Sequence, residues 1–138
     1  MKVLGAALLL CFVVFCAFQL PTDTLCKTIR TGRFHSYRAG TGAHTIILRT
    51  DSLQLEIRPA SKDTTFWKIS WLSNCRFAAE YISGPGPRNE AELQRYRNTV
   101  LFYNIREITK DYYVGTTTVR GADGSNSYLT DTTWLRAR

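Results

Sequence analysis

Cys26 and Cys75 are the residues whose type and position point most directly to chemistry in this 138-residue chain. They stand beyond an apolar N-terminal stretch, whereas Cys11 and Cys16 lie inside it. Two cysteines that reach an oxidising compartment form one disulfide by default, and no Cys-x-x-Cys spacing indicates a redox site. We therefore expect a structural Cys26–Cys75 bridge, which contributes about 4 kcal/mol by the loop-entropy relation.

The other reactive side chains form no catalytic or metal-binding pattern. His35 and His44 fall on neighbouring expected strands, but no third residue repeats a ligand spacing, so a weak zinc or copper site is a minor alternative. The chain has no Gly-x-Ser-x-Gly motif, and Gly40-Thr-Gly42 is too short for a phosphate-binding loop. We expect no enzyme activity, no cofactor and no bound metal.

Residues 1–20 have the form of an export signal peptide. Lys2 provides a positive start, and the stretch 4–20 is almost wholly apolar. Its length is near the lower limit for crossing a bilayer, so an uncleaved anchor is one alternative. A lipoprotein signal ending at Cys16 or Cys26 is a weaker one, because neither cysteine follows a small residue. We expect export to the periplasm or the exterior, with membrane contact only through the leader if it is retained.

The rest of the chain is long enough for one domain. We expect residues 21–31 to form an N-terminal segment tied by the disulfide, and residues 32–138 to form a β-barrel domain. The net charge is +7, and the 13 arginines are scattered along the chain. A clustered basic stripe would indicate a nucleic-acid partner, whereas scattered arginines indicate solvated strand faces. Nucleic acid is therefore not an expected partner.

Beyond Gly32 the hydrophobic pattern alternates with a period of two, which predicts β-strands. Apolar residues fall on one face of each segment, as an antiparallel sheet with one wet side requires. A Gly/Pro breaker at 84–87 precedes one short helix at 89–97, which is either a lid over a cavity or, as we expect, a surface connection. The expected strands cover 33–38, 44–50, 53–58, 67–71, 75–81, 101–106, 112–119 and 128–135.

About eight short antiparallel strands in one domain predict an all-β fold, either a small closed barrel or a flattened sandwich. Closure would remove unpaired edge strands, which matters in a chain so rich in β-forming residues. An eight-stranded barrel is either filled by its side chains or holds one small ligand. The pattern leaves both possibilities open.

Three stretches carry a further signal: CKTIRTGRF at 26–34, RTDSLQLE at 49–56 and WLSNCRF at 71–77. Their order and spacing resemble a group of small exported proteins of the Bacteroidota. The resemblance covers residues 26–77 and is looser beyond them, and the insertion at 84–88 departs from the group's pattern. It implies a lipocalin-like β-barrel, supports the pairing of the two cysteines, and brings no established activity with it.

Polar and aromatic side chains on the expected inner faces are the candidate ligand contacts. Arg49, Gln54 and Glu56 flank a hairpin, where they either pair across neighbouring strands or project into the barrel toward a ligand. Ligand pockets are mostly apolar with a few polar groups, which directs attention to the aromatic residues as well. The candidate ligand-binding residues are Arg49, Gln54, Glu56, Trp67, Trp71 and Tyr103.

Three functional hypotheses follow from this architecture. The leading one is an exported lipocalin-like binding protein for a small apolar or amphipathic ligand. The alternative is an interaction module of the cell envelope, with a filled barrel, that contacts a protein partner through its outer face or the 84–97 loop. That loop carries Arg95, Tyr96 and Arg97, residue types that are common in interface hot spots. Oligonucleotide binding is the weakest hypothesis, because export argues against it.

Overall fold

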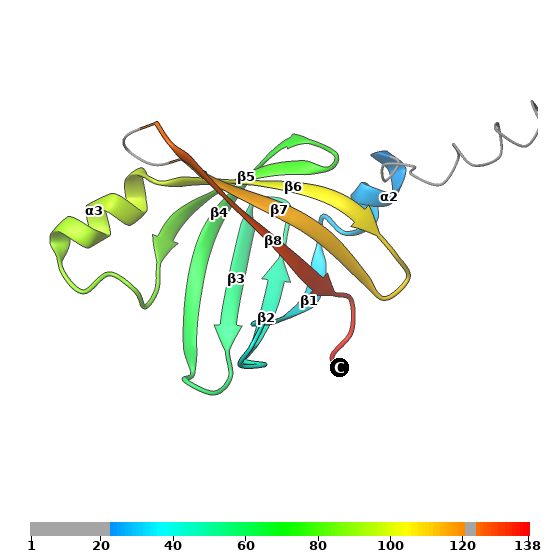
Figure 1. The fold of residues 1–138 in the computed structure, drawn as a ribbon, viewed down its shortest axis with the longest axis horizontal. Helices are drawn as coiled ribbons and strands as arrows, with labels where there is room; N and C mark the ends of the chain where they lie inside the picture. The colour runs from blue at the N-terminus through cyan, green and yellow to red at the C-terminus, as the bar shows by residue number, and fades with distance from the viewer. Residues whose placement is uncertain (1–22, 121–123) are drawn as a thin grey trace, which may run out of the picture.

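The computed structural model describes residues 23–120 and 124–138, and Figure 1 shows the path of the chain. The expected signal peptide, residues 1–20, lies outside the described residues. The described elements are α2 (Asp23–Thr28), β1 (Gly32–Tyr37), β2 (His44–Arg49), β3 (Leu53–Arg58), β4 (Asp63–Ser73), β5 (Arg76–Ser83), α3 (Glu90–Asn98), β6 (Val100–Ile108), β7 (Tyr112–Arg120) and β8 (Asn126–Trp134).

Within the described residues, strands β1 to β8 form one closed antiparallel barrel, which confirms the expected all-β fold. Each strand pairs with its neighbour in sequence, and β1 pairs with β8 to close the ring. Most connections are tight turns, such as the one after β2, where the Thr50 N–H donates to the Leu53 carbonyl at 2.8 Å. The connection from β5 to β6 is longer and carries α3.

The seam between β1 and β8 is the shortest pairing in the ring. Two residue pairs join these strands, whereas β7 and β8 pair at nine positions. A side-chain hydrogen bond from Ser36 Oγ to Asp131 Oδ2, 3.1 Å long, strengthens the seam. The first half of β8 pairs with no described strand on its other side, and its Tyr128 and Leu129 are 69% and 64% exposed.

Strand β3 turns its polar face into the barrel, which reverses what its apolar alternation suggests. Gln54 is buried, and it lines the barrel interior together with Glu56. Because successive side chains of a strand point to opposite faces, Leu53, Leu55 and Ile57 face outward. The barrel interior is therefore partly polar, and part of its outer surface is apolar.

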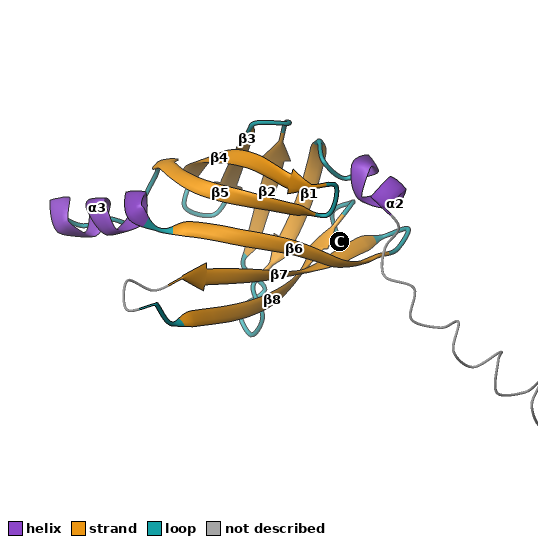
Figure 2. Cartoon of the chain, turned by 90° about the horizontal axis from the view of Figure 1, so that it is seen from above, coloured by secondary structure: helices purple, strands orange, loops and turns teal. Residues whose placement is uncertain are grey.

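Helix α2 was not expected from the sequence, and it lies at one end of the barrel (Figure 2). It carries Cys26, whose disulfide to Cys75 holds it against the turn between β4 and β5 with a Cα–Cα distance of 5.1 Å. The Cys75 carbonyl also accepts a hydrogen bond from the Ile105 N–H at 2.9 Å. The predicted disulfide is thus confirmed, and it fastens α2 to three strands.

Helix α3 lies at the opposite end of the barrel and projects to one side of it (Figure 2). Asn89 caps it, since its side-chain oxygen accepts from the Glu92 N–H at 2.9 Å, and Glu92 accepts from the Arg88 N–H at 2.8 Å. None of its residues is buried, as in a surface connection. Among the described residues, no helix has the length and apolar character needed to cross a membrane.

Candidate functional site

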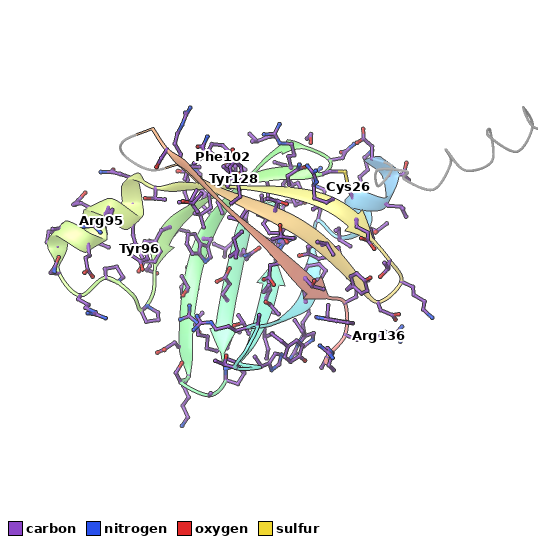
Figure 3. All side chains as sticks on the ribbon, viewed as in Figure 1. Cys26, Arg95, Tyr96, Phe102, Tyr128 and Arg136 are labelled. Atoms are coloured by element: carbon purple, nitrogen blue, oxygen red, sulfur yellow. A yellow bond between two sulfur atoms is a disulfide. The ribbon has the colours of Figure 1, made fainter. Side chains whose placement is uncertain are left out.

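The end of the barrel beside α2 is a packed floor (Figure 3, near Cys26). Its centre is a cluster of apolar side chains drawn from α2 and the strands, and Tyr113 at its middle has no exposed surface. Phe34 meets Tyr113 edge-on with 5.7 Å between ring centroids. The buried floor residues are Cys26, Ile29, Phe34, Ile47, Ile105 and Tyr113, with Trp71, Cys75, Tyr103, Ile108 and Leu135 packed against them.

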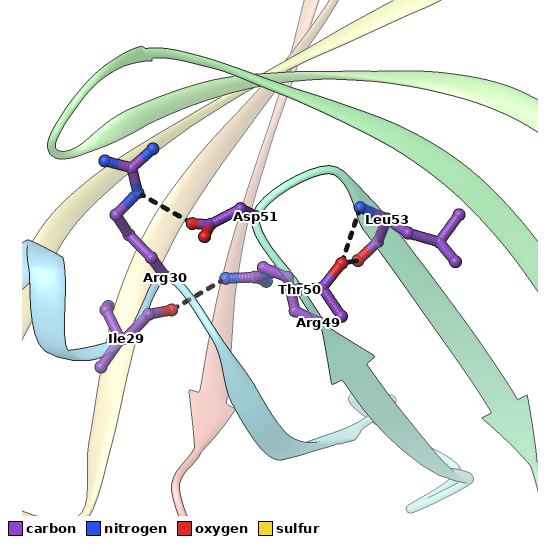
Figure 4. Close-up of polar contacts among 6 residues, drawn as sticks. All are labelled: Ile29, Arg30, Arg49, Thr50, Asp51 and Leu53. Atoms are coloured by element: carbon purple, nitrogen blue, oxygen red, sulfur yellow. Dashed lines mark hydrogen bonds and ion pairs between the residues drawn. The ribbon is translucent and has the colours of Figure 1, made fainter.

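Arg49 is the polar centre of this floor, and it is only 4% exposed. Its Nε donates to Gln54 Oε1 at 2.6 Å, and its Nη2 donates to Tyr113 Oη at 2.9 Å. Its Nη1 donates to the Ile29 carbonyl at 3.3 Å, the bond drawn in Figure 4. Arg49 therefore ties the segment after α2 to strands β3 and β7.

Three aromatic rings surround the Arg49 guanidinium. Its Cζ atom lies 4.7 Å from the ring centroid of Phe77, 5.2 Å from that of Phe34 and 5.9 Å from that of Tyr113. Cation–π contacts of this kind stabilise a desolvated guanidinium. Three hydrogen bonds and three ring contacts within the protein already occupy the Arg49 guanidinium. The main role of Arg49 is therefore to hold the floor residues in position.

A polar relay leads from Arg49 away from the floor. Gln54 accepts from Arg49 and donates through Nε2 to Glu56 Oε1 at 2.9 Å. Burial raises the pKa of the Glu56 carboxyl, and the polar N–H groups of Gln54 and Trp67, with the charges of Arg58 and Arg49, offset part of that rise. The relay thus brings a desolvated carboxyl into the barrel interior.

Beyond the floor the barrel contains a cavity of about 180 Å³. This volume is below the roughly 300–1,000 Å³ of pockets for drug-sized ligands, so only a small molecule or water fits. All eight strands contribute to its wall, which combines hydroxyl, amide and charged groups with aromatic and aliphatic ones. The lining residues are Ser36, Thr45, Ile47, Arg49, Gln54, Glu56, Trp67, Phe77, Ala79, Leu101, Tyr103, Thr117, Asp131 and Thr133.

Two lining residues carry buried donors that make no well-formed hydrogen bond within the described part of the chain. They are the Trp67 indole nitrogen, which faces the Glu56 carboxyl, and the Tyr103 hydroxyl, which lies near Thr133. Leaving a buried polar group without a partner costs about 1–3 kcal/mol, and such groups are rare in proteins. A guest molecule or ordered water in the cavity is the natural partner for both.

Tyr103 reaches into the cavity because Gly115 on the neighbouring strand β7 has no side chain. A Cβ atom at Gly115 would overlap the Tyr103 ring. The ring also stacks on Phe77 with centroids 5.0 Å apart and an interplanar angle of 17°. Burial raises the pKa of Tyr103, so its hydroxyl stays neutral and available as a donor.

The structure places the sequence-predicted contact residues in two groups. Arg49, Gln54, Glu56, Trp67 and Tyr103 all line the cavity. The sixth, Trp71, does not line it. The Trp71 ring packs at the floor instead, under the Arg30 guanidinium at 4.5 Å and against Phe77.

The sequence-based prediction missed the polar wall formed by the last strands. Thr117, Asp131 and Thr133 line the cavity, together with Ser36 on β1. They alternate with a period of two, but they are polar, so hydropathy assigns them to the outside. These residues face inward because β8 pairs with β1 to close the barrel. A prediction of their orientation would therefore require that pairing.

A second hollow of about 260 Å³ shares Trp67 and Leu101 with the cavity. Its other lining residues are Arg95, Tyr96 and Thr99, at the end of α3. Figure 3 shows Arg95 and Tyr96 on this helix, on the side away from the floor. Trp67 and Leu101 therefore form a wall common to the cavity and to a groove at the α3 end.

The two histidines meet on the outside of the barrel, as their places on neighbouring strands allow. His35 Nδ1 and His44 Nε2 lie 3.0 Å apart, and the His44 ring also stacks on Tyr37. Burial, with the nearby His44 and Arg33, lowers the pKa of His35. No cluster of three or more metal-ligating side chains occurs among the described residues.

Comparison with known protein families, with curated proteins and with solved structures returned no match. The resemblance to exported proteins of the Bacteroidota therefore stays an expectation from the three sequence motifs.

Proposed function

We propose that this protein is an exported lipocalin-like binding protein that holds one small amphipathic molecule inside its barrel. The observation that carries the proposal is the 180 Å³ cavity, whose wall contains two buried donors without a well-formed hydrogen bond, on Trp67 and Tyr103. A barrel evolved only for stability would fill such a space, because unfilled volume and unpaired donors both cost free energy.

The wall favours an amphipathic guest over a purely apolar one. The wall contains apolar side chains, among them Phe77, Ala79 and Leu101. It also contains charged side chains, among them Glu56 and Asp131. A wholly apolar guest would leave these polar groups unsatisfied. The size of the cavity favours a compact molecule over a long acyl chain.

The disulfide supports the exported part of the proposal. A Cys26–Cys75 bridge is stable in an oxidising compartment, where the expected signal peptide would direct the chain. The binding role requires no enzyme activity, cofactor or nucleic acid. The protein would act in the periplasm or outside the cell.

Native mass spectrometry of the oxidised protein, purified gently from its own compartment, tests the proposal. We expect an additional small-molecule mass that is lost on denaturation. Ala79→Leu places extra carbons in the cavity and should abolish the retained mass, whereas Ala91→Leu on the exposed side of α3 should keep it. Bare protein in every preparation, or a mass retained equally by both variants, would overturn the proposal.

An apolar outer face favours a second candidate function, that of an envelope interaction module. Ile46, Leu48, Leu55 and Ile57 face outward as directly paired neighbours on β2 and β3, and Phe66 continues the row on β4. All are half-buried, and the two described helices lie at the ends of the barrel, away from this face (Figure 2). Contiguous apolar surface of this kind marks interaction sites.

The partner that fits this face is a protein with an apolar docking surface and an acidic rim. Arg33 is exposed beside Leu48 and makes no ion pair with a described residue. Leu55→Thr with Phe66→Thr should abolish capture of such a partner from envelope extract, whereas Leu72→Thr, an exposed leucine on β4, should not. Capture that survives the double substitution, or that depends on the 84–97 loop instead, would exclude this face.

A further inference from the structure

We propose that the guest of the barrel is a small organic amine, whose ammonium group binds between the carboxylates of Glu56 and Asp131. This inference rests on the proposed function and names the ligand class of the same cavity. It comes from the charges of the wall, from the unused hydrogen-bonding capacity of the two carboxylates, and from the aromatic rings beside them.

The charge of the cavity wall is opposite to that of the chain. The protein carries a net charge of +7, yet the lining residues include two carboxylates, Glu56 and Asp131, and a single guanidinium. That guanidinium, on Arg49, is already held by Gln54, Ile29 and Tyr113. Once Glu56 is ionised, the cavity therefore offers one excess negative charge to whatever enters it. Burial raises the pKa of the Glu56 carboxyl, and a cation bound beside it would favour the ionised form.

Glu56 has unused capacity to accept hydrogen bonds. Its Oε1 accepts from Gln54, the Trp67 N–H faces the carboxyl, and it makes no ion pair with a described residue. Taking a carboxylate out of water is costly unless a positive partner replaces the lost hydration. An ammonium group in the cavity would supply that partner and up to three N–H donors.

Asp131 is satisfied only in part. Its Oδ2 accepts from Ser36 Oγ at 3.1 Å, and its Oδ1 accepts from the Thr132 N–H at 2.8 Å. Each carboxylate oxygen has a second lone-pair site, so both oxygens can accept one further hydrogen bond. The two existing hydrogen bonds fix the orientation of the Asp131 carboxylate and leave it able to accept further hydrogen bonds.

The aromatic residues complete a site for a cation with an apolar body. Trp67, Phe77 and Tyr103 line the cavity, and aromatic faces attract ammonium groups. The Tyr103 hydroxyl, which makes no well-formed hydrogen bond, can accept from the ammonium as well as donate. An anion would meet two carboxylates and an engaged arginine, so we expect anionic guests to be excluded.

Isothermal titration calorimetry with three matched probes tests the amine proposal: 2-phenylethylamine, the neutral 2-phenylethanol and the anionic phenylacetate. They share one carbon skeleton and differ mainly in the charge of the head group. With the exported, oxidised protein near neutral pH, we expect the amine to bind at least about tenfold more tightly than the alcohol, as one charge-assisted hydrogen bond provides. We expect no measurable heat with phenylacetate.

Variants assign the preference to the two carboxylates. Glu56→Gln and Asp131→Asn keep the side-chain shape, and each should lower amine affinity by about tenfold while leaving the alcohol unchanged. Glu80→Gln is the control, because Glu80 lies on the outer face of β5 and pairs with Lys68 at 3.6 Å. It should leave all affinities unchanged. Having two separate variants keeps the test valid if one of them fails to fold.

The outcomes separate the amine proposal from the proposed function. Tighter binding of the alcohol or of phenylacetate would overturn the amine class while leaving a ligand-binding cavity in place. Equal amine affinity in the wild type and both carboxylate variants would overturn it too. If the amine and the alcohol both fail to bind and no retained mass is found in the native protein, the cavity holds only water, and the proposed function fails with it.

Discussion

The floor and the cavity of this barrel are built from the same strands, yet their buried charged groups differ in how fully they are paired. In the floor, Arg49 has three hydrogen bonds and three aromatic neighbours. In the cavity, the Glu56 carboxyl is desolvated and has no ion pair with a described residue. The Trp67 and Tyr103 donors beside it make no well-formed hydrogen bond, a condition that the Trp71 indole shares at the floor. A buried charge with all its partners serves stability, whereas a desolvated carboxyl that faces a cavity can bind a ligand.

The disulfide gives the largest expected effect, since it fastens α2 to the floor. Replacing Cys26 and Cys75 together by serine should lower the free energy of unfolding by about 4 kcal/mol. The cause is the entropy that the open 49-residue separation restores to the unfolded chain. Urea denaturation of the variant and of the oxidised wild type measures the difference. A loss below about 1 kcal/mol would mean that the floor does not depend on α2.

Removal of Arg49 should have the second-largest effect on the free energy of unfolding, because several buried groups lose their hydrogen-bond partner at once. Arg49→Met leaves Gln54 Oε1, the Ile29 carbonyl and the Tyr113 hydroxyl without their donor, and should cost about 3 kcal/mol. Arg76→Met is the matched control, since Arg76 is exposed on β5 and should change stability by less than about 0.5 kcal/mol. Equal effects in the two variants would contradict a structural role for Arg49.

The sequence predicts the barrel well because the barrel depends on local alternation. Strands follow from a period of two, and the bridge follows from two cysteines beyond a leader, so the fold and the disulfide are confirmed. Helix α2 was missed because six residues carry little periodic signal, and its stability comes from the tertiary contacts of Cys26.

The candidate site was predicted only in part, for a physical reason. Gln54 and Glu56 were candidates because of their place beside a hairpin, but hydropathy would put them outside and Leu55 inside. Asp131 and Thr133 were missed because their inward orientation depends on pairing with β1, which is about a hundred residues away in the chain. Polar residues inside a barrel cannot be recognised by hydropathy, since they break the rule on which hydropathy rests.

Tyr113 in the floor and Tyr103 in the cavity allow the two regions to be compared through the loss of a single hydroxyl group. The Tyr113 hydroxyl accepts from Arg49 in the floor, so Tyr113→Phe should cost about 2 kcal/mol, as expected for a hydrogen bond to a charged group. The Tyr103 hydroxyl lies near Thr133 but makes no well-formed hydrogen bond, so Tyr103→Phe should be neutral or slightly stabilising in the empty protein. Urea midpoints of both variants, measured without ligand, check this. Equal costs would show that the two hydroxyls are equally satisfied.

The smallest expected effect is a pH dependence that Glu56 gives to the cavity. Because burial raises its pKa, the folded protein holds this proton more tightly than the unfolded chain does. The unfolded state then binds fewer protons, so the contribution of Glu56 to stability falls as pH rises from the ordinary glutamate pKa through the raised one, and then levels off. Glu56→Gln should remove this decline from urea midpoints measured between about pH 4 and about pH 8. Glu80→Gln should keep it. A decline retained by Glu56→Gln would show that another group causes it, and a wild type without any decline would show that Glu56 is paired in the folded state as the floor groups are.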